Sequence, residues 1–273
     1  MLRGFYTAAS GMLAQQRRAE ILSNNMANAN TPGYKAEQSV TRAFPEMLLS
    51  YIETDLNGQV KQKEIGPLHT GVYVQEVLPL YTQGDMKETN VPSDIALIEE
   101  ALPIFEETNL RGALFYAVET PDGVVKYTKN GHFTLSEEGY LTIGGNNVLS
   151  TEGNPILITS TDFDVTPNGQ IFINGEPTNQ QIDVRFAEDI RNLVREGNGL
   201  YRTVDEAELP SAVNNEEIRY QLKQGFLEGS NVDITRSYTE LLSAYRTFEA
   251  NQKVLQAYDK SMDKAVNEVG RIR

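Results

Sequence analysis

The sequence predicts an α+β protein in which helices from both chain ends pair as a coiled-coil-like module beside a β-rich, barrel-like or sandwich-like outer domain. Residues 234–269 contain no proline or glycine, and their apolar side chains recur in steps of three and four. Residues 2–26 repeat this spacing. Residues 124–186 instead show short apolar runs separated by turn signals, which is typical of strands.

The C-terminal segment is the strongest helix prediction. Asn231 or Asp233 can cap its start, and an unbroken helix over residues 234–269 would be roughly 50 Å long. Its apolar seam contains Ile234, Tyr238, Leu241, Tyr245, Phe248, Leu255 and Met262. The seam fits a coiled coil, but Leu242 and Val254 widen it, so a helix lying along the protein's own body is equally compatible with the pattern.

The N-terminal helix is predicted over residues 2–26. Its apolar face includes Phe5, Ala9 and Met12, is broadened by Leu22, and is weakened by Gly4 and Gly11. Such a helix is marginal alone, so we expect it to bury its stripe against the other terminal helix or against other subunits. A membrane-surface helix is the competing interpretation, but the polar face lacks the dense Lys and Arg typical of one.

Composition excludes several classes of protein. The 273-residue chain has a formal charge of −14 and a pI near 4.7, which argues against binding nucleic acid or an anionic membrane surface. With no cysteine, disulfides, zinc-thiolate sites and thiol catalysis are excluded. No stretch is long and apolar enough for membrane insertion, and the N-terminus lacks a signal-peptide pattern, so we expect export by another route.

The middle of the chain changes character twice. Residues 35–80 are predicted as an extended linker with a hairpin, with the clearest strand at 71–80. After residue 81 the pattern becomes β, interrupted by an acidic segment at 98–111 that is interpreted as a solvated face. Strands are predicted at 113–118, 124–128, 132–135, 140–143, 156–158, 164–166, 170–174 and 182–186, with turns that include 167–169 and 175–177.

Several longer strings resemble one known family. The strings FYTAASGM (5–12), SNNMAN (23–28) and TPGYK (31–35) are similar to the N-terminal signature of bacterial flagellar rod and hook axial proteins. QGFLEGSNVD (224–233) resembles the opening of the family's C-terminal helix, and YTKNGHFTL (127–135) resembles its outer-domain motif. The two terminal matches cover roughly a third of the chain. The acidic segment at 98–111 departs from the family pattern.

The resemblance implies a structural, non-enzymatic subunit of the flagellar basal body that needs no cofactor, metal or catalytic residue. It implies four segments: an axial helix and turn at 1–34, the linker at 35–80, the outer domain at 81–226, and a C-terminal axial helix at 227–273 that pairs with 1–34. The expected partners are further copies of the chain, other rod and hook proteins, and the flagellar type III export apparatus, which would deliver it outside the cytoplasmic membrane without a cleaved signal peptide.

The expected assembly interface consists of Phe5, Ala9, Met12, Leu22, Asn24, Asn25, Asn28, Ile234, Tyr238, Leu241, Tyr245, Phe248, Leu255 and Met262. The resemblance implies a distal-rod-like subunit that transmits torque to the hook. Chain length favours a rod subunit over a hook protein but does not separate a proximal from a distal position, and a hook or filament-cap component is the related alternative.

One alternative of another class is a cell-wall-associated binding or peptidoglycan-hydrolysing protein anchored through its termini. Glu99, Glu100, Glu106 and Glu107 offer the carboxylates that glycosidases use in pairs. His69 and His132 are the only histidines, which leaves few members for a serine triad or a histidine-based metal site. The residues at 162–169 are better explained by a strand turn than by a calcium loop, because Pro167 stands where an EF-hand requires glycine.

Overall fold

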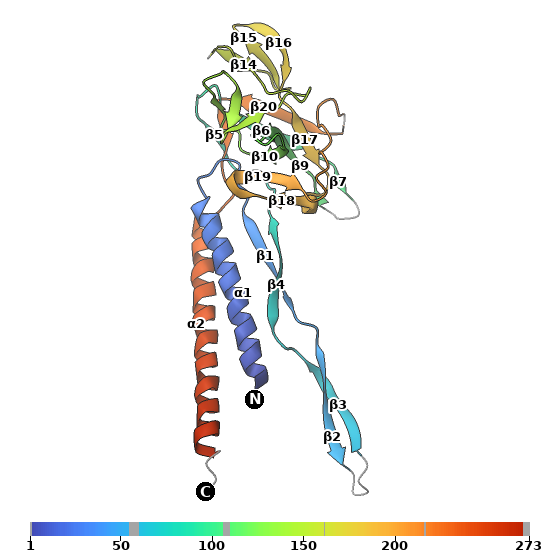
Figure 1. Cartoon of the computed structure of the whole chain (residues 1–273), viewed down its shortest axis with the longest axis vertical. Helices are drawn as coiled ribbons and strands as arrows, with labels where there is room; N and C mark the ends of the chain where they lie inside the picture. The colour runs from blue at the N-terminus through green and yellow to red at the C-terminus, as the bar shows by residue number, and fades with distance from the viewer. Residues whose placement is uncertain (1, 55–59, 106–109, 161, 216, 270–273) are drawn as a thin grey trace. The chain divides into compact units, whose positions relative to one another are not determined.

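The computed structural model describes residues 2–54, 60–105, 110–160, 162–215 and 217–269. The chain is α+β and divides into two compact units (Figure 1). Unit 1 consists of Met1–Ala27, Glu37–Pro79 and Asp233–Arg273, and contains the terminal helices. Unit 2 consists of Asn28–Ala36 and Leu80–Val232, and is β-rich as predicted.

Two long helices of unit 1 lie side by side, α1 (Leu2–Ala27) and α2 (Ile234–Lys264) (Figure 1). The carboxylate of Asp233 accepts a hydrogen bond from the Arg236 N–H at 3.0 Å, so Asp233 is the N-cap of α2. The prediction of an unbroken α-helix to residue 269 is wrong in its last turn, where Ala265–Val269 is π-helical. The last carbonyls of an α-helix lack onward partners, so a wider turn costs little there.

Unit 1 also contains two antiparallel strand pairs. β1 (Glu37–Ala43) pairs with β4 (Val72–Pro79), and β2 (Met47–Thr54) pairs with β3 (Val60–Leu68). The strand predicted at 71–80 is confirmed as β4. β1 and β4 contact α1, and Thr7 Oγ1 donates a hydrogen bond to the Thr70 carbonyl at 3.1 Å. The segment predicted as a linker therefore holds strands that pack on the N-terminal helix.

Unit 2 is built on an antiparallel sheet of eight strands (Figure 1). Along its path lie β11 (Thr134–Leu135), β12 (Leu141–Ile143), β13 (Asn146–Val148), β9 (Ala113–Glu119), β10 (Val125–Thr128), β19 (Leu200–Thr203) and β18 (Leu193–Arg195); β17 (Val184–Ala187) also pairs with β9. Leu114, Tyr116 and Val118 on one face of β9 join the main hydrophobic core, and Phe115 and Ala117 on the other face join a second cluster. Burial on both faces explains why this strand reads as a continuous apolar run.

Smaller sheets complete unit 2. They are the three-stranded sheet β14 (Phe163–Val165), β15 (Gln170–Ile173) and β16 (Glu176–Gln181), and the pairs β6 (Ile95–Ala101) with β20 (Arg219–Gln224), β5 (Met86–Glu88) with β21 (Phe226–Glu228), and β7 (Ile104–Phe105) with β8 (Leu110–Arg111). Short 3₁₀ turns are at η1 (Ile190–Asn192) and η2 (Gly197–Gly199).

Two predicted turns and one predicted strand of unit 2 differ in how well they match the structure. The turn predicted at 167–169 is confirmed, because it joins β14 to β15. The turn predicted at 175–177 is wrong in extent, because Glu176 and Pro177 already belong to β16, an edge strand that tolerates proline. The strand predicted at 156–158 is also wrong. Ile156 and Ile158 are buried, but the segment makes only isolated bridges such as Tyr140 to Leu157.

Candidate assembly interface

Contact between the terminal helices buries one stripe of α2. Ser237 and Ala244 are buried on it, and the half-buried positions continue the same spacing of three and four residues. The stripe runs through Ser237, Leu241, Ala244, Phe248, Asn251, Leu255, Tyr258 and Met262. A repeat averaging 3.5 residues keeps one face of a helix toward its neighbour. This face of α2 is therefore the one that packs on α1.

Glycines on α1 allow the two helices to approach closely. A Cβ built on Gly4 would lie 2.0 Å from the Tyr258 hydroxyl oxygen, and one built on Gly11 would lie 3.0 Å from the Asn251 amide nitrogen. By sequence alone, these glycines only weaken the helix. Their lack of a side chain provides the space into which two long side chains of α2 fit.

One ion pair links α1 to α2. Arg18 Nη2 lies 3.0 Å from Glu240 Oε2, and Arg236 Nε lies 3.0 Å from Glu240 Oε1. Hydrogen bonds from Arg236 and then from Arg18 lower the pKa of the Glu240 carboxyl. The contacts of Arg18 with Glu240 and of Gly4 with Tyr258 also show that the two helices run antiparallel.

The predicted interface residues of α2 fall into two groups. Leu241, Phe248, Leu255 and Met262 belong to the stripe against α1. The other three face solvent, with exposed fractions of 50% for Ile234, 52% for Tyr238 and 56% for Tyr245. The predicted seam therefore combines two neighbouring faces, one packed within the chain and one still exposed.

The predicted residues of α1 differ more widely in their surroundings. Leu22 is buried, and Phe5, Ala9 and Met12 are half-buried. Asn24 is exposed.

The other two predicted asparagines serve the structure around the end of α1. Asn25 is buried, and its side chain bonds the backbone N–H and carbonyl of Glu37 at 2.9 and 2.8 Å. In unit 2, the Asn28 carbonyl accepts the Thr31 N–H at 3.1 Å. Asn25 therefore has a specific structural role, because its two hydrogen bonds fix the backbone at the start of β1.

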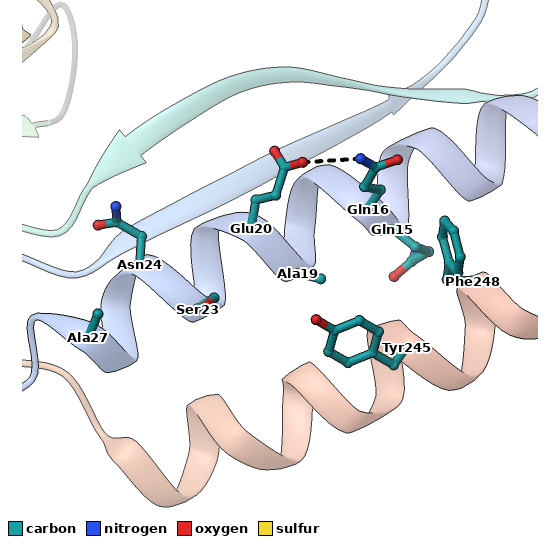
Figure 2. A pocket seen from close by; sticks show the side chains of 9 residues that line it. All are labelled: Gln15, Gln16, Ala19, Glu20, Ser23, Asn24, Ala27, Tyr245 and Phe248. Atoms are coloured by element: carbon teal, nitrogen blue, oxygen red, sulfur yellow. Dashed lines mark hydrogen bonds between the residues drawn. The ribbon is translucent and has the colours of Figure 1, made fainter.

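A groove of about 540 Å³ lies between α1 and α2 (Figure 2). Tyr245 and Phe248 of α2 line one wall, and Ala19 lies opposite them on α1. The rim is polar, and Gln16 donates a hydrogen bond to Glu20 at 3.2 Å. The remaining lining residues are Gln15, Ser23, Asn24 and Ala27. A groove with apolar walls and a polar rim has the composition that is typical of a protein-binding surface.

Unit 1 has a second hollow at the other end of the helix pair. It has a volume of about 780 Å³ and is lined by side chains of both helices and of the strands. Tyr6 of α1, Val254 of α2 and Met47 of β2 contribute apolar surface, and each is exposed. The two ends of the helix pair therefore carry different apolar surfaces.

The acidic segment has a structural role at Glu99. Its carboxylate lies 2.5 Å from Lys129 Nζ and accepts the Leu114 N–H at 3.2 Å, and both charged side chains are buried. The interpretation of residues 98–111 as a solvated face is thus wrong at Glu99, because Lys129 compensates the burial of its charge. Glu100 is exposed, and Glu106 and Glu107 lie outside the described residues.

Neither a metal centre nor a membrane-spanning helix is found within the part of the chain that the structure describes. There, no group of three or more His, Cys, Asp or Glu side chains is arranged to hold a metal ion. Likewise, none of the described helices combines the length and apolar character that crossing a membrane requires.

Comparison with known families matches both chain ends. Residues 5–35 match the model described as "Flagella basal body rod protein", and residues 223–268 match "Flagellar basal body rod FlgEFG protein C-terminal". These segments contain most of α1 with its asparagine-rich end, and all of α2.

Comparison with whole proteins extends over the full chain. The chain is 57% identical over 272 residues to the flagellar hook-basal body complex protein FlhO of Bacillus subtilis, and the match covers 100% of both. It is 29% identical to the flagellar basal-body rod protein FlgG of the same organism, with 98% and 99% covered, and 27% identical to FlgG of Borreliella burgdorferi, with 98% of each covered. None of these names describes a peptidoglycan hydrolase, so the alternative finds no support. This chain belongs to the family of flagellar rod and hook-basal body proteins.

Proposed function

We propose that this structural, axial component of the flagellar basal body polymerises through its terminal helices into a distal-rod-like segment that transmits torque to the hook. One observation carries the proposal: the packed helix pair still exposes large apolar side chains. Ile234, Tyr238, Leu242 and Tyr245 follow one another on α2 at spacings of four, four and three, and all are exposed. A contiguous exposed apolar face marks an interaction site.

The positions of the apolar surfaces favour an open polymer. Tyr6 is exposed on α1 near the contact of Gly4 with Tyr258, whereas the stripe from Ile234 to Tyr245 lies near the contact of Arg18 with Glu240. The two surfaces therefore lie at opposite ends of an antiparallel pair and differ from each other. A contact between unlike surfaces of two copies is heterologous. Repeated contacts of this kind build an open helical polymer when the rotation from one copy to the next does not close a ring.

We also propose that α1 and α2 pair as an antiparallel coiled coil. The contacts of Gly4 with Tyr258 and of Gly11 with Asn251 step by seven residues on both helices in opposite directions. A seven-residue step is the repeat of a coiled coil. In this proposal Leu241, Phe248, Leu255 and Met262 hold the pair together, while Ile234, Tyr238 and Tyr245 contact the next subunit.

The proposal also includes the segment boundaries and the partners that the resemblance implies. The segments 1–34 and 227–273 would form the axial part, 35–80 the connection and 81–226 the outer domain. The partners would be further copies, other rod and hook proteins and the flagellar type III export apparatus. The FlhO and FlgG names support a place in the hook-basal body.

The test replaces Tyr238 and Tyr245 by Asp in the full chain. Both side chains are exposed, so the monomer should keep its helix content, but charges placed in a dry contact should abolish incorporation because a buried charge without a partner is costly. Quantitative mass spectrometry of purified hook-basal bodies, together with a motility assay, measures the outcome.

The control is Ser243→Asp, compared with the single variant Tyr245→Asp; it adds the same single charge at an exposed position of α2 about 160° away from Tyr245 around the helix. It should be incorporated normally. Hook-basal bodies that contain the doubly substituted protein in the wild-type ratio would disprove the proposed surface.

A further inference from the structure

A buried ion pair in unit 2 joins residues from the two ends of the chain. Lys35 Nζ lies 2.5 Å from Glu228 Oε1, and the exposed fractions of the two side chains are only 1% and 5%. The pair closes a sequence separation of 193 residues. Burial, followed by the positive charge of Lys129, lowers the pKa of the Lys35 amine.

Backbone groups of both segments converge on the same pair. The Gly33 N–H donates to the Glu228 carbonyl and the Gly84 N–H donates to the Glu228 carboxylate, each at 2.8 Å. Lys35 Nζ also donates to the Thr82 carbonyl at 2.9 Å. Glu228 is thus the point at which the entering, middle and leaving parts of unit 2 meet.

Asn231 reinforces this junction. Its side-chain oxygen accepts the Ala36 N–H at 2.7 Å, and its side-chain nitrogen donates to the Leu80 carbonyl at 2.7 Å. Lys35, Glu228 and Asn231 are named here the chain-end cluster. Lys35 belongs to the TPGYK string, and Glu228 and Asn231 belong to the QGFLEGSNVD string.

Charge burial makes the two ends depend on each other. A charged lysine or glutamate buried without a partner is strongly destabilising, and the destabilisation is removed only when the partner is present. If one end leaves unit 2, the other end retains an uncompensated buried charge and loses the hydrogen bonds around Glu228. Undocking of one segment therefore favours undocking of the other.

We propose that Lys35 and Glu228 are positioning residues that make docking of the two chain ends on unit 2 one cooperative event. Residues 28–36 and 226–232 then dock on the rest of unit 2 together, and neither segment docks alone. The points at which the chain enters and leaves this unit are fixed jointly. This inference holds whether or not the chain polymerises as proposed above.

The experiment measures hydrogen exchange in the full chain with Lys35→Met, Glu228→Gln, and both together. The reporter in Lys35→Met is the Gly229 amide, which bonds the Asp85 carbonyl at 2.8 Å. The reporter in Glu228→Gln is the Leu80 amide, which bonds the Ala36 carbonyl at 2.8 Å. Neither reporter bond involves the substituted side chain.

Each single substitution should speed exchange at both reporters roughly a hundredfold, because breaking a buried pair leaves a charge without a partner. The double substitution should return both toward the wild-type rate, since it leaves no buried charge. Acceleration only in the substituted segment, or a double variant that exchanges as fast as the single variants, would overturn the proposal. If a single variant fails to fold, the double variant decides: protected reporters support cooperative docking, and an unfolded double variant contradicts it.

A partly exposed pair of the same unit provides the matched control. Lys126 lies 2.6 Å from Glu196, with exposed fractions of 23% and 30%. Lys126→Met and Glu196→Gln should change exchange at the two reporters no more than a few-fold, because exposed pairs contribute little. A similar acceleration in these controls would mean that loss of any ion pair loosens unit 2, which also contradicts the proposal.

Discussion

At the scale of single residues, the terminal signature is explained by close backbone contacts. Gly33 has φ of +69°, and a Cβ built on it would lie 2.4 Å from the Lys129 carbonyl oxygen. The TPGYK string therefore packs directly on the backbone of the YTKNGHFTL string. Local rules indicated a turn at Pro32 and Gly33, but no local pattern could indicate the partner backbone about a hundred residues away.

This contact predicts that Gly33→Ala destabilises unit 2 strongly. Alanine must adopt a left-handed conformation, at about 1–2 kcal/mol, and its methyl group must also displace a backbone carbonyl. Gly153 has φ of +80° with nothing within 4 Å of an added Cβ, so Gly153→Ala should incur only the conformational cost. Denaturant unfolding measures the difference. Equal losses of unfolding free energy in the two variants would contradict the packing argument.

At the scale of secondary structure elements, the sequence was most informative where one pattern decides the element. Periodicity and capping located α1 and the start of α2, and turn residues located β10, β14 and β15. β6 and β20 were missed, because strand pairing between residues 95–101 and 219–224 depends on distant partners. The seam of α2 combined two faces because Leu241, Phe248, Leu255 and Met262 border both, and periodicity alone cannot say which face is already occupied.

The pairing of α1 with α2 should depend on acid pH through Glu240. Its folded-state pKa is lowered by Arg236 and Arg18, so the unfolded chain binds more protons over the interval below the ordinary carboxyl pKa. The stabilisation is therefore complete above that ordinary value and is lost as pH falls through the lowered one. The pairs are partly exposed, so the effect should be no more than about 1 kcal/mol.

Helix melting of wild type and Glu240→Gln, followed by circular dichroism, tests this dependence. The wild type should melt at a higher temperature at neutral pH, and the difference between the two midpoints should shrink as the pH falls below the ordinary carboxyl pKa, because the Glu240 carboxylate becomes protonated. The exposed i,i+4 pair of Glu249 with Lys253 provides the control; Glu249→Gln should produce a smaller shift because it does not link the helices. A difference in melting temperature between wild type and Glu240→Gln that persists unchanged in acid would rule out this origin.

At the scale of the whole molecule, charge is divided unevenly between the two units. The residues of unit 1 include 13 Lys or Arg and 13 Asp or Glu, whereas those of unit 2 include 11 and 25. The entire formal charge of −14 is therefore carried by unit 2. Helices that pack closely in a polymer are best electrically neutral, because repulsion grows as water is excluded. This division of charge agrees with a role for unit 1 in the proposed contacts. Composition alone could not reveal the division, because unit 1 is formed by three separate segments of the chain.

This division predicts that salt promotes self-assembly of the purified chain. Copies that meet through a neutral unit 1 still carry repelling unit 2 surfaces, and salt screens repulsion between exposed charges within a Debye length of about 10 Å at 0.1 M. The fraction of polymer measured by sedimentation should therefore rise with sodium chloride.

Neutralising four exposed carboxylates, by Asp122→Asn, Glu137→Gln, Glu138→Gln and Glu152→Gln, should shift the same rise to lower salt. Four exposed amide substitutions in unit 1 that preserve its neutrality, Gln38→Asn, Gln75→Asn, Gln252→Asn and Gln256→Asn, should leave the salt response unchanged. A polymer fraction that falls with added salt would mean that attraction between opposite charges, and not the apolar surface of the helices, holds the copies together.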